Sequence, residues 1–108
     1  MKYPFIIIVK GLHVRGMALF PFLLFRNRQL SADAVMLNHE MIHHRQQVEL
    51  LIIPFYVLYL INYLFNRWRY TNHHDAYRNI IFEREAYAND QDLQYLRQRR
   101  WFAFCQYR

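Results

Sequence analysis

The chain has 108 residues, of which 55% are hydrophobic and 19% aromatic, so it can bury a sizeable core but is too short for two. Its 14 Lys and Arg against 8 Asp and Glu give a formal charge of +6, which favours an anionic partner such as nucleic acid or the anionic face of a membrane. Cys105 is the only cysteine, which excludes an intrachain disulfide, and we expect a single domain over 1–108 in a reducing, cytoplasmic setting.

The first thirty residues predict a small β-ribbon. Phe5–Val9 is a short run rich in β-branched residues, and Met17–Phe25 is a second apolar run. The two glycines of the chain lie between these runs, and Pro21 predicts an edge position or a bulge for the second strand. Arg26–Gln29 is expected to form the turn out of the sheet. The run Phe5–Val9 is too short for a signal peptide and lacks a small-residue cleavage site.

A long helix is predicted next, because residues 32–53 contain neither Gly nor Pro. Ser31 or Asp33 can cap its start by accepting hydrogen bonds from free backbone N–H groups of the first turn. Side chains recur along it at spacings of three and four, namely Met36, His39, His43, Gln46, Gln47 and Leu50. Pro54 is expected to kink or end this helix, and a second, apolar helix then runs to about Trp68.

The apolar segment Leu50–Phe65 carries no charge and allows two interpretations. As a helix it would span about 24 Å, short of the ~30 Å hydrocarbon core of a bilayer. We therefore favour a buried core helix. The alternative is an interfacial segment anchored by the basic and aromatic residues Arg67–Tyr70, which would give the protein a peripheral contact with the inner face of the membrane.

The last third of the chain predicts one further helix and an arginine-rich, aromatic tail. Residues 69–75 are polar and are expected to form a loop. Candidate caps for the helix after this loop are Thr71, Asn72 and Asp75. The helix is predicted from Ala76 to about Leu96, with a break near Asn89–Asp90.

The segment HEMIH, residues 39–43, carries the chemistry of the long helix. On a helix His39 and His43 project from the same face, so they can offer two imidazole nitrogens to one Zn²⁺ ion. Glu40 is then placed to take a proton from zinc-bound water, as the general base does in His-Glu-x-x-His zinc hydrolases. The alternative is a polar patch on a helix. The apolar residues nearby indicate burial, and His and Glu without a partner are costly to bury, so a shared metal ion explains them better.

A catalytic zinc site usually takes a third protein ligand and leaves one position for water. Glu83 and Glu85 lie about forty residues after His43 on a predicted helix. Because they point to nearly opposite sides of that helix, only one of the two can face the metal.

With these two segments the chain resembles the gluzincin type of zinc metallopeptidase, in which a second helix donates a glutamate to the metal. FEREAY is similar to the Glu-x-x-Ala-Asp signature of that type, and in this register Glu83 is the implied ligand, with Glu85 as the alternative. Tyr87 stands where gluzincins often have the aspartate that orients the first histidine, and Asp90 or Asn89, one turn further, can take that role. The chain also resembles a small bacterial family with NHExIHxRQQ and FEREAY segments, for which no reaction is established.

The remaining polar residues near the two segments have less specific interpretations. Gluzincin sites need a donor that stabilises an oxyanion. Candidates for this role, or for support of the ligands, are His73, His74, Tyr77 and Tyr87. Gln46 and Gln47 are interpreted as partners of neighbouring backbone groups.

These observations predict an α+β fold, minimal and zincin-like, with a β-ribbon over 1–30 followed by three main helices in a metal-site region over 31–108. The first functional hypothesis is a zinc-dependent hydrolase acting on a peptide or protein, with one Zn²⁺ held by His39, His43 and Glu83 and with Glu40 activating the water. The alternative is a non-catalytic, metal-stabilised protein at the cytoplasmic face of the membrane. Nucleic-acid binding is disfavoured, because the basic tail belongs to no recognisable module.

Overall fold

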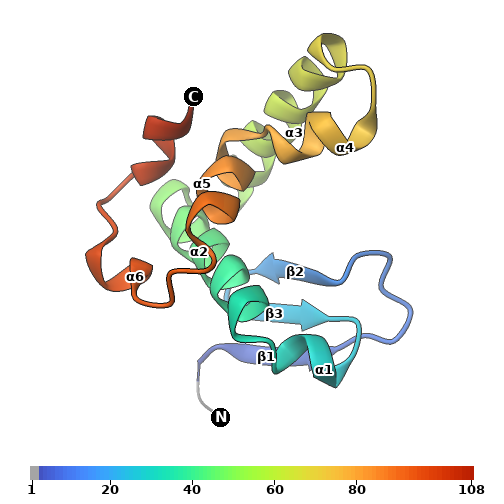
Figure 1. Cartoon of the computed structure of the whole chain (residues 1–108), viewed down its shortest axis with the longest axis vertical. Coiled ribbons are helices and arrows are strands. Elements are labelled where there is room, and N and C mark those ends of the chain that lie inside the picture. Colours follow the sequence, from blue (N-terminus) through green and yellow to red (C-terminus); the bar gives the residue numbers. More distant parts are fainter. Residues whose placement is uncertain (1–2) are drawn as a thin grey trace.

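A small sheet is followed by helices along the chain, so the predicted α+β class is confirmed (Figure 1). The computed structural model describes residues 3–108, and residues 1 and 2, at the start of the predicted ribbon, lie outside the described part. The strands are β1 (Phe5–Ile8), β2 (Gly16–Leu19) and β3 (Phe22–Phe25). The helices are α1 (Arg28–Ser31), α2 (Ala34–Leu50), α3 (Ile52–Arg69), α4 (His73–Arg78), α5 (Ile81–Asn89), α6 (Tyr95–Gln98) and the 3-10 helix η1 (Ala103–Tyr107).

The sheet has the order β1-β3-β2, with β1 parallel and β2 antiparallel to the central β3. The prediction of one strand over Met17–Phe25 is wrong, because this run forms the β2–β3 hairpin with Leu19 opposite Phe22. Pro21 lies in the turn between them rather than at an edge or bulge, where its fixed φ and missing N–H are tolerated. β2 is therefore an edge strand.

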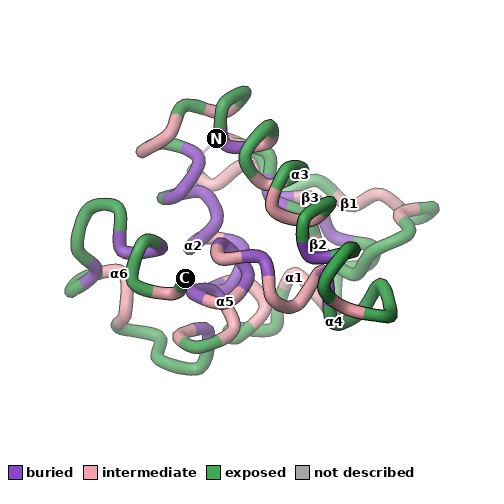
Figure 2. The backbone as a smooth tube through the Cα atoms, turned by 90° about the horizontal axis from the view of Figure 1, so that it is seen from above, coloured by how far each residue is buried: buried purple, intermediate pink, exposed green. Residues whose placement is uncertain are grey.

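Helix α2 lies between the sheet and helix α5, and Figure 2 shows the buried residues concentrated on α2 and α5. Its N-terminus begins at Ala34, capped by Asp33, whose Oδ1 accepts hydrogen bonds from the backbone N–H groups of Val35 and Met36. The predicted turn at Arg26–Gln29 instead leads into α1, which Asn27 caps. The sheet side of α2 packs on a core cluster of Ala18, Leu23 and Phe25.

The predicted break between the two long helices is placed wrongly by three residues. The chain turns at Leu51, whose φ of 64° and ψ of 151° end α2 and start α3, and the two helices are bent by 111°. Pro54 is the third residue of α3, where a backbone N–H has no partner within the helix, so the proline costs no hydrogen bond. The side chain of Leu51 is exposed, and its backbone conformation is one that glycine adopts more readily.

The favoured interpretation of Leu50–Phe65 as a buried core helix is wrong for most of its residues. Within α3 only Phe55 and Asn66 are buried. Among the residues that the structure describes, no single helix is long and apolar enough to cross a membrane, whereas α2 and α3 together pass that test as a bent pair.

The predicted helix from Ala76 to Leu96 is divided into α4, α5 and α6. The expected break near Asn89–Asp90 is confirmed, while a second break at Ile80 was not predicted. Ile80 adopts an extended backbone and is fully buried with Phe55, Phe82 and Phe104 in a core cluster. Burial of this side chain against the core therefore overrides the helical pattern of the segment.

The segment expected to be a loop over residues 69–75 is shorter than predicted. Asn72 caps α4 by accepting a hydrogen bond from the backbone N–H of Asp75, at 2.8 Å. His73 and His74 therefore lie in the first turn of α4 and not in a loop.

Candidate metal centre

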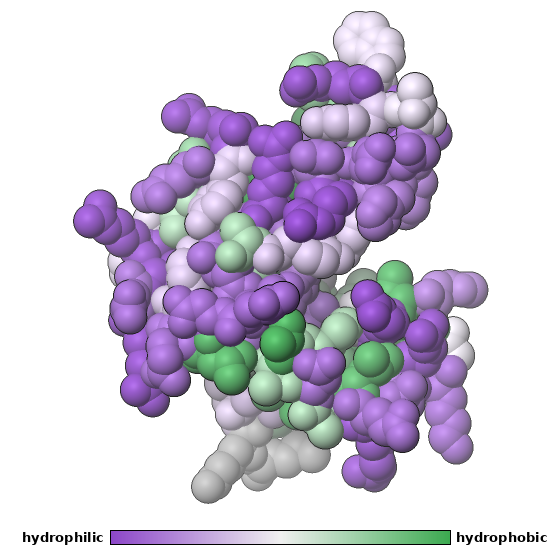
Figure 3. Space-filling view, viewed as in Figure 1, coloured by the Kyte–Doolittle hydropathy of each residue, from purple (hydrophilic) through white to green (hydrophobic). Residues whose placement is uncertain are grey.

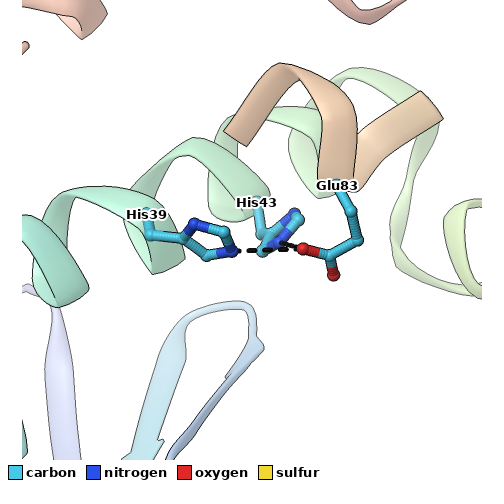
Figure 4. A group of neighbouring side chains, drawn as sticks. All are labelled: His39, His43 and Glu83. Atoms are coloured by element: carbon cyan, nitrogen blue, oxygen red, sulfur yellow. Dashed lines mark hydrogen bonds and ion pairs between the residues drawn. The ribbon is translucent and has the colours of Figure 1, made fainter. Parts of the chain in front are cut away.

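Two elements bring three metal-ligating side chains together, as Figure 4 shows. Helix α2 provides His39 and His43, one turn apart on the same face, and α5 provides Glu83. One carboxylate oxygen of Glu83, Oε1, lies 3.1 Å from Nε2 of His39 and 3.1 Å from Nε2 of His43. All three side chains are buried, and their ligand atoms converge between α2 and α5.

The spacing of these atoms fits a metal ion. Bonds of ~2.0–2.2 Å in tetrahedral directions place ligand atoms about 3.3–3.5 Å apart, slightly more than the distances from Glu83 to the two histidines. All three ligand atoms lie within 4.8 Å of one another. The buried group can therefore bind a metal ion after a small outward movement of the side chains.

The second nitrogen of each histidine is also engaged. Nδ1 of His39 lies 3.1 Å from Oδ2 of Asp90, and Nδ1 of His43 lies 2.7 Å from Oε1 of Gln46. With a proton on each Nδ1 donating to these oxygens, each Nε2 can offer its electron pair to a metal once any proton on Nε2 has been displaced. The sequence offered Asp90 or Asn89 to orient the first histidine, and of these two side chains it is Asp90 that contacts His39.

Two neighbours of His39 hold this arrangement in place. Asn38 donates from Nδ2 to the backbone oxygens of Asp90 and Asp92, at 2.8 and 3.0 Å, and so fastens the end of α5 to α2. Tyr87 packs edge-to-face with His39, with the ring centroids 4.5 Å apart. The role of Asn38 was missed in the sequence, where no spacing signals it.

The other oxygen of Glu83 accepts a hydrogen bond of 2.6 Å from the hydroxyl of Tyr59 on α3. Burial, together with the nearby Glu83, raises the pKa of Tyr59, so its hydroxyl stays protonated as a donor. Tyr59 was also missed in the sequence, where it belongs to the apolar run. Three helices therefore meet at the carboxylate of Glu83.

The metal-free site holds an ion pair between Glu83 and His43. Burial alone would lower the pKa of His43 from 6.5, but the charge of Glu83 and the hydrogen bonds to Glu83 and Gln46 raise it to about 9. Burial would likewise raise the pKa of Glu83, but the positive His43 and the hydrogen bonds of both histidines lower it well below 4.5. In the metal-free protein the proton on His43 therefore supplies the positive charge that balances Glu83, as a metal cation would.

This proton predicts a pH dependence of metal binding. The metal must displace the proton of His43, whose pKa is about 9, so we expect the affinity to rise about tenfold per pH unit up to about pH 9 and to level off above it. A histidine with the ordinary pKa of 6.5 would give a plateau from about pH 7. Titration against a competing chelator between pH 6 and 10 measures this, and constant affinity above pH 7 would contradict the prediction.

Glu85, the alternative third ligand, lies on the other side of α5 and away from the histidines. Its carboxylate is fully buried and accepts hydrogen bonds from Arg99, from Tyr95 and from Nε2 of Gln46. Arg99 bridges in turn to Glu49 of α2. Of the two glutamates, Glu83 is therefore the one that reaches the histidines, and Glu85 anchors the C-terminal segment.

Glu40 is buried beside the three ligands and faces two cavities. One, of about 200 Å³, is lined by His43, Glu83 and aromatic residues of α3, and the other, of about 620 Å³, by His39 and basic residues. Glu40 belongs to the lining of both, and burial raises the pKa of its carboxyl. Figure 3 shows the molecular surface notched on this side, between the sheet and the arm formed by α3 and α4. The carboxylate can therefore meet a molecule that enters from solvent.

The four residues considered as oxyanion donors lie at different places around these cavities. Tyr77 lines both cavities with Glu40, whereas His73, His74 and Tyr87 line only the larger one. His73 is paired with the hydroxyl of Tyr63 at 2.7 Å, on the α3–α4 arm. Tyr77 is thus the best placed of the four beside Glu40.

The two glutamines after His43 act on backbone groups, as interpreted from the sequence. Gln46 donates to the carbonyl of Phe82, at 3.1 Å. Gln47 accepts a 2.7 Å hydrogen bond from the N–H of Phe20 and donates to the carbonyl of Ala18, at 2.9 Å. The amide of Gln47 therefore occupies the edge of β2 from Ala18 onward, while Gly16 and Met17 line the smaller cavity.

Comparison with family models, with curated protein sequences and with solved structures finds no match for this chain. The geometry of the residues described above is consequently the basis on which a function can be assigned.

Proposed function

We propose that this protein is a minimal, gluzincin-like zinc hydrolase that cleaves peptide bonds. The observation that carries the proposal is the position of Glu83 Oε1, 3.1 Å from each histidine Nε2, with Glu40 on the same turn of α2 facing two cavities. A purely structural site would not require a buried carboxylate beside the ligands and open to a cavity.

Zinc is the metal that suits this set of donors. Two imidazole nitrogens and one carboxylate oxygen are the ligands of catalytic zinc in several hydrolases, with a fourth position left for water. When bound, Zn²⁺ would increase the acidity of that water and polarise a substrate carbonyl. Asp90 and Gln46 would keep the two imidazoles oriented toward it.

Glu40 would move the proton of the reaction. As the water oxygen attacks the carbonyl carbon, the Glu40 carboxylate accepts a proton from the water and passes it to the nitrogen of the leaving amine, while the carbon–nitrogen bond breaks. Burial raises the pKa of the Glu40 carboxyl above its ordinary value, which favours holding the proton between the two transfers. Tyr77, on the same cavity, is the donor we assign to the oxyanion.

The edge of β2 offers a place for the substrate backbone. A peptide can pair with the edge strand beside Gly16 and Met17, next to Glu40 and His43. Beyond them Gln47 and the hydroxyl of Tyr56 already occupy the carbonyl of Ala18. The available edge is therefore short, and we expect the enzyme to hold only a few residues of a substrate.

The proposal is tested by comparing metal-free protein with protein reconstituted with zinc, on a library of fluorescence-quenched peptides. We expect hydrolysis only in the zinc form and one zinc ion per chain by mass spectrometry. His39→Gln and His43→Gln should lose the metal, whereas His44→Gln, a buried histidine on the same helix outside the ligand group, should keep it.

Two outcomes would decide against the proposal. Equal zinc content in all three histidine variants would end the metal assignment. Zinc binding without cleavage of any peptide, but with a higher melting temperature, would favour the alternative of a metal-stabilised protein without catalysis.

A further inference from the structure

The hydrogen-bonding side chains of helix α3 face the rest of the protein. Tyr59 donates to Glu83, at 2.6 Å, and Asn66 donates to the carbonyl of Ala76, at 3.0 Å. The side-chain oxygen of Asn62 accepts from the backbone N–H of Ile81, at 2.8 Å. The hydrogen-bonding side chains in the middle of this helix therefore point toward α4 and α5.

The opposite face of α3 is apolar and faces solvent. Its exposed fractions range from about half for Val57 to 77% for Ile53 and 87% for Trp68. The residues of this apolar stripe recur at spacings of one, three and four: Ile53, Val57, Leu60, Ile61, Leu64, Phe65 and Trp68. Within the described residues 3–108 no segment covers the stripe. A helix that turns its hydrogen-bonding side chains inward and leaves an apolar stripe outward is suited to an apolar environment outside the protein.

The charge around the stripe favours a lipid surface. Residues 52–72 contain no Asp or Glu, and Arg67 and Arg69 flank Trp68 in the last turn of α3. An exposed Trp between two arginines matches the headgroup region of a bilayer, where an indole ring and cationic side chains both find partners. A second copy of the chain would carry the same charge of +6 and repel, whereas an anionic bilayer attracts it.

We propose that α3 docks on anionic membranes, lying in the plane of the interface with the apolar stripe inserted among the lipid chains and Arg67 and Arg69 at the phosphates. The eighteen residues of α3 reach about 27 Å, short of the ~30 Å hydrocarbon thickness, and α2 carries buried polar residues, so the helix lies on the bilayer and does not span it. This docking is independent of the metal and therefore goes beyond the proposed hydrolysis.

The test is flotation of the full chain with vesicles of phosphatidylcholine, with or without phosphatidylglycerol. We expect flotation with the anionic vesicles, less with phosphatidylcholine alone, and less at high salt. The double variant Val57→Glu/Leu64→Glu should lower the bound fraction at least tenfold. Replacing both Arg67 and Arg69 by Gln should weaken binding to the anionic vesicles roughly tenfold or more.

The matched control is Val48→Glu/Leu93→Glu, which makes the same chemical change at residues that are also about half exposed, but outside α3. Its vesicle-bound fraction should be within twofold of that of the unaltered chain. Circular dichroism should show that all variants are folded. Equal flotation of the stripe variant and the control would overturn the proposal. If the unaltered chain does not float but forms a dimer, and the Val57→Glu/Leu64→Glu variant is monomeric, the membrane proposal is overturned in favour of contact between copies. His39→Gln should float normally, which separates this result from failure of the metal site.

Discussion

Glu40→Gln is expected to keep the metal and to lower kcat for peptide hydrolysis by about 10²–10⁴-fold. Gln has nearly the same shape but cannot accept the proton of the attacking water. Glu40 does not belong to the group His39, His43 and Glu83, so the ligand atoms remain. Zinc content by mass spectrometry and kcat with the best peptide of the library measure the two effects separately.

The same substitution has a predicted effect on stability that a structural residue would not show. Burial raises the pKa of Glu40, so its ionised form is less stable in the folded chain than in the unfolded chain. This cost grows as the pH rises above the ordinary pKa of 4.5, and Gln removes it. Metal-free Glu40→Gln should therefore unfold at an equal or higher urea concentration at pH 7. Retained activity, or clear destabilisation, would contradict the role assigned to Glu40.

Glu85→Gln is expected to destabilise the fold by about 3 kcal/mol, because it leaves a buried arginine without one of its partners. The side chains of Glu85 and Arg99 are both fully buried, so solvent does not screen their interaction. Arg99 keeps Glu49, which limits the loss. A loss of this size is a large share of the 5–15 kcal/mol typical of a domain, and urea unfolding of the metal-free chain measures it.

Glu83→Gln, two residues earlier on α5, is the matched comparison. It should lower zinc affinity at least a hundredfold, since a neutral amide replaces the charged ligand, whereas Glu85→Gln should leave the affinity of the folded protein within a few fold. Similar zinc affinities in the two variants would contradict the assignment of Glu83. An unchanged unfolding midpoint in Glu85→Gln would contradict the anchoring role of Glu85.

The elements near the metal centre could be predicted from local signals. A cap at Ser31 or Asp33 and the absence of Gly and Pro indicated a helix through residues 39–43, and helical spacing placed His39 and His43 on one face. Helical spacing alone could not choose between Glu83 and Glu85. That choice came from the resemblance, and the structure places Glu83 at the histidines.

The parts that could not be predicted depend on contacts between distant segments. No pattern relates Tyr59 to Glu83, and none selects Arg99 among the arginines of the tail as the partner of Glu85, because both roles arise only when α3 and the C-terminal segment pack on α5. The break at Ile80 follows from burial of its side chain in the core. Hydrophobicity over residues 50–65 likewise cannot distinguish a helix buried in protein from one that faces another apolar environment.

The bend at Leu51 sets the distance between the metal centre and the apolar helix. The two helices are bent by 111° there, and Tyr59 of α3 donates a hydrogen bond of 2.6 Å to Glu83 of the ligand group, so the site lies against the inner side of α3. With α3 in the interface of a bilayer, the reactive bond of a substrate would stand roughly 10 Å above the axis of α3, a reach of about three extended residues. The juxtamembrane segments of membrane-anchored proteins, and not their transmembrane segments, are therefore the peptides that such a protein would encounter.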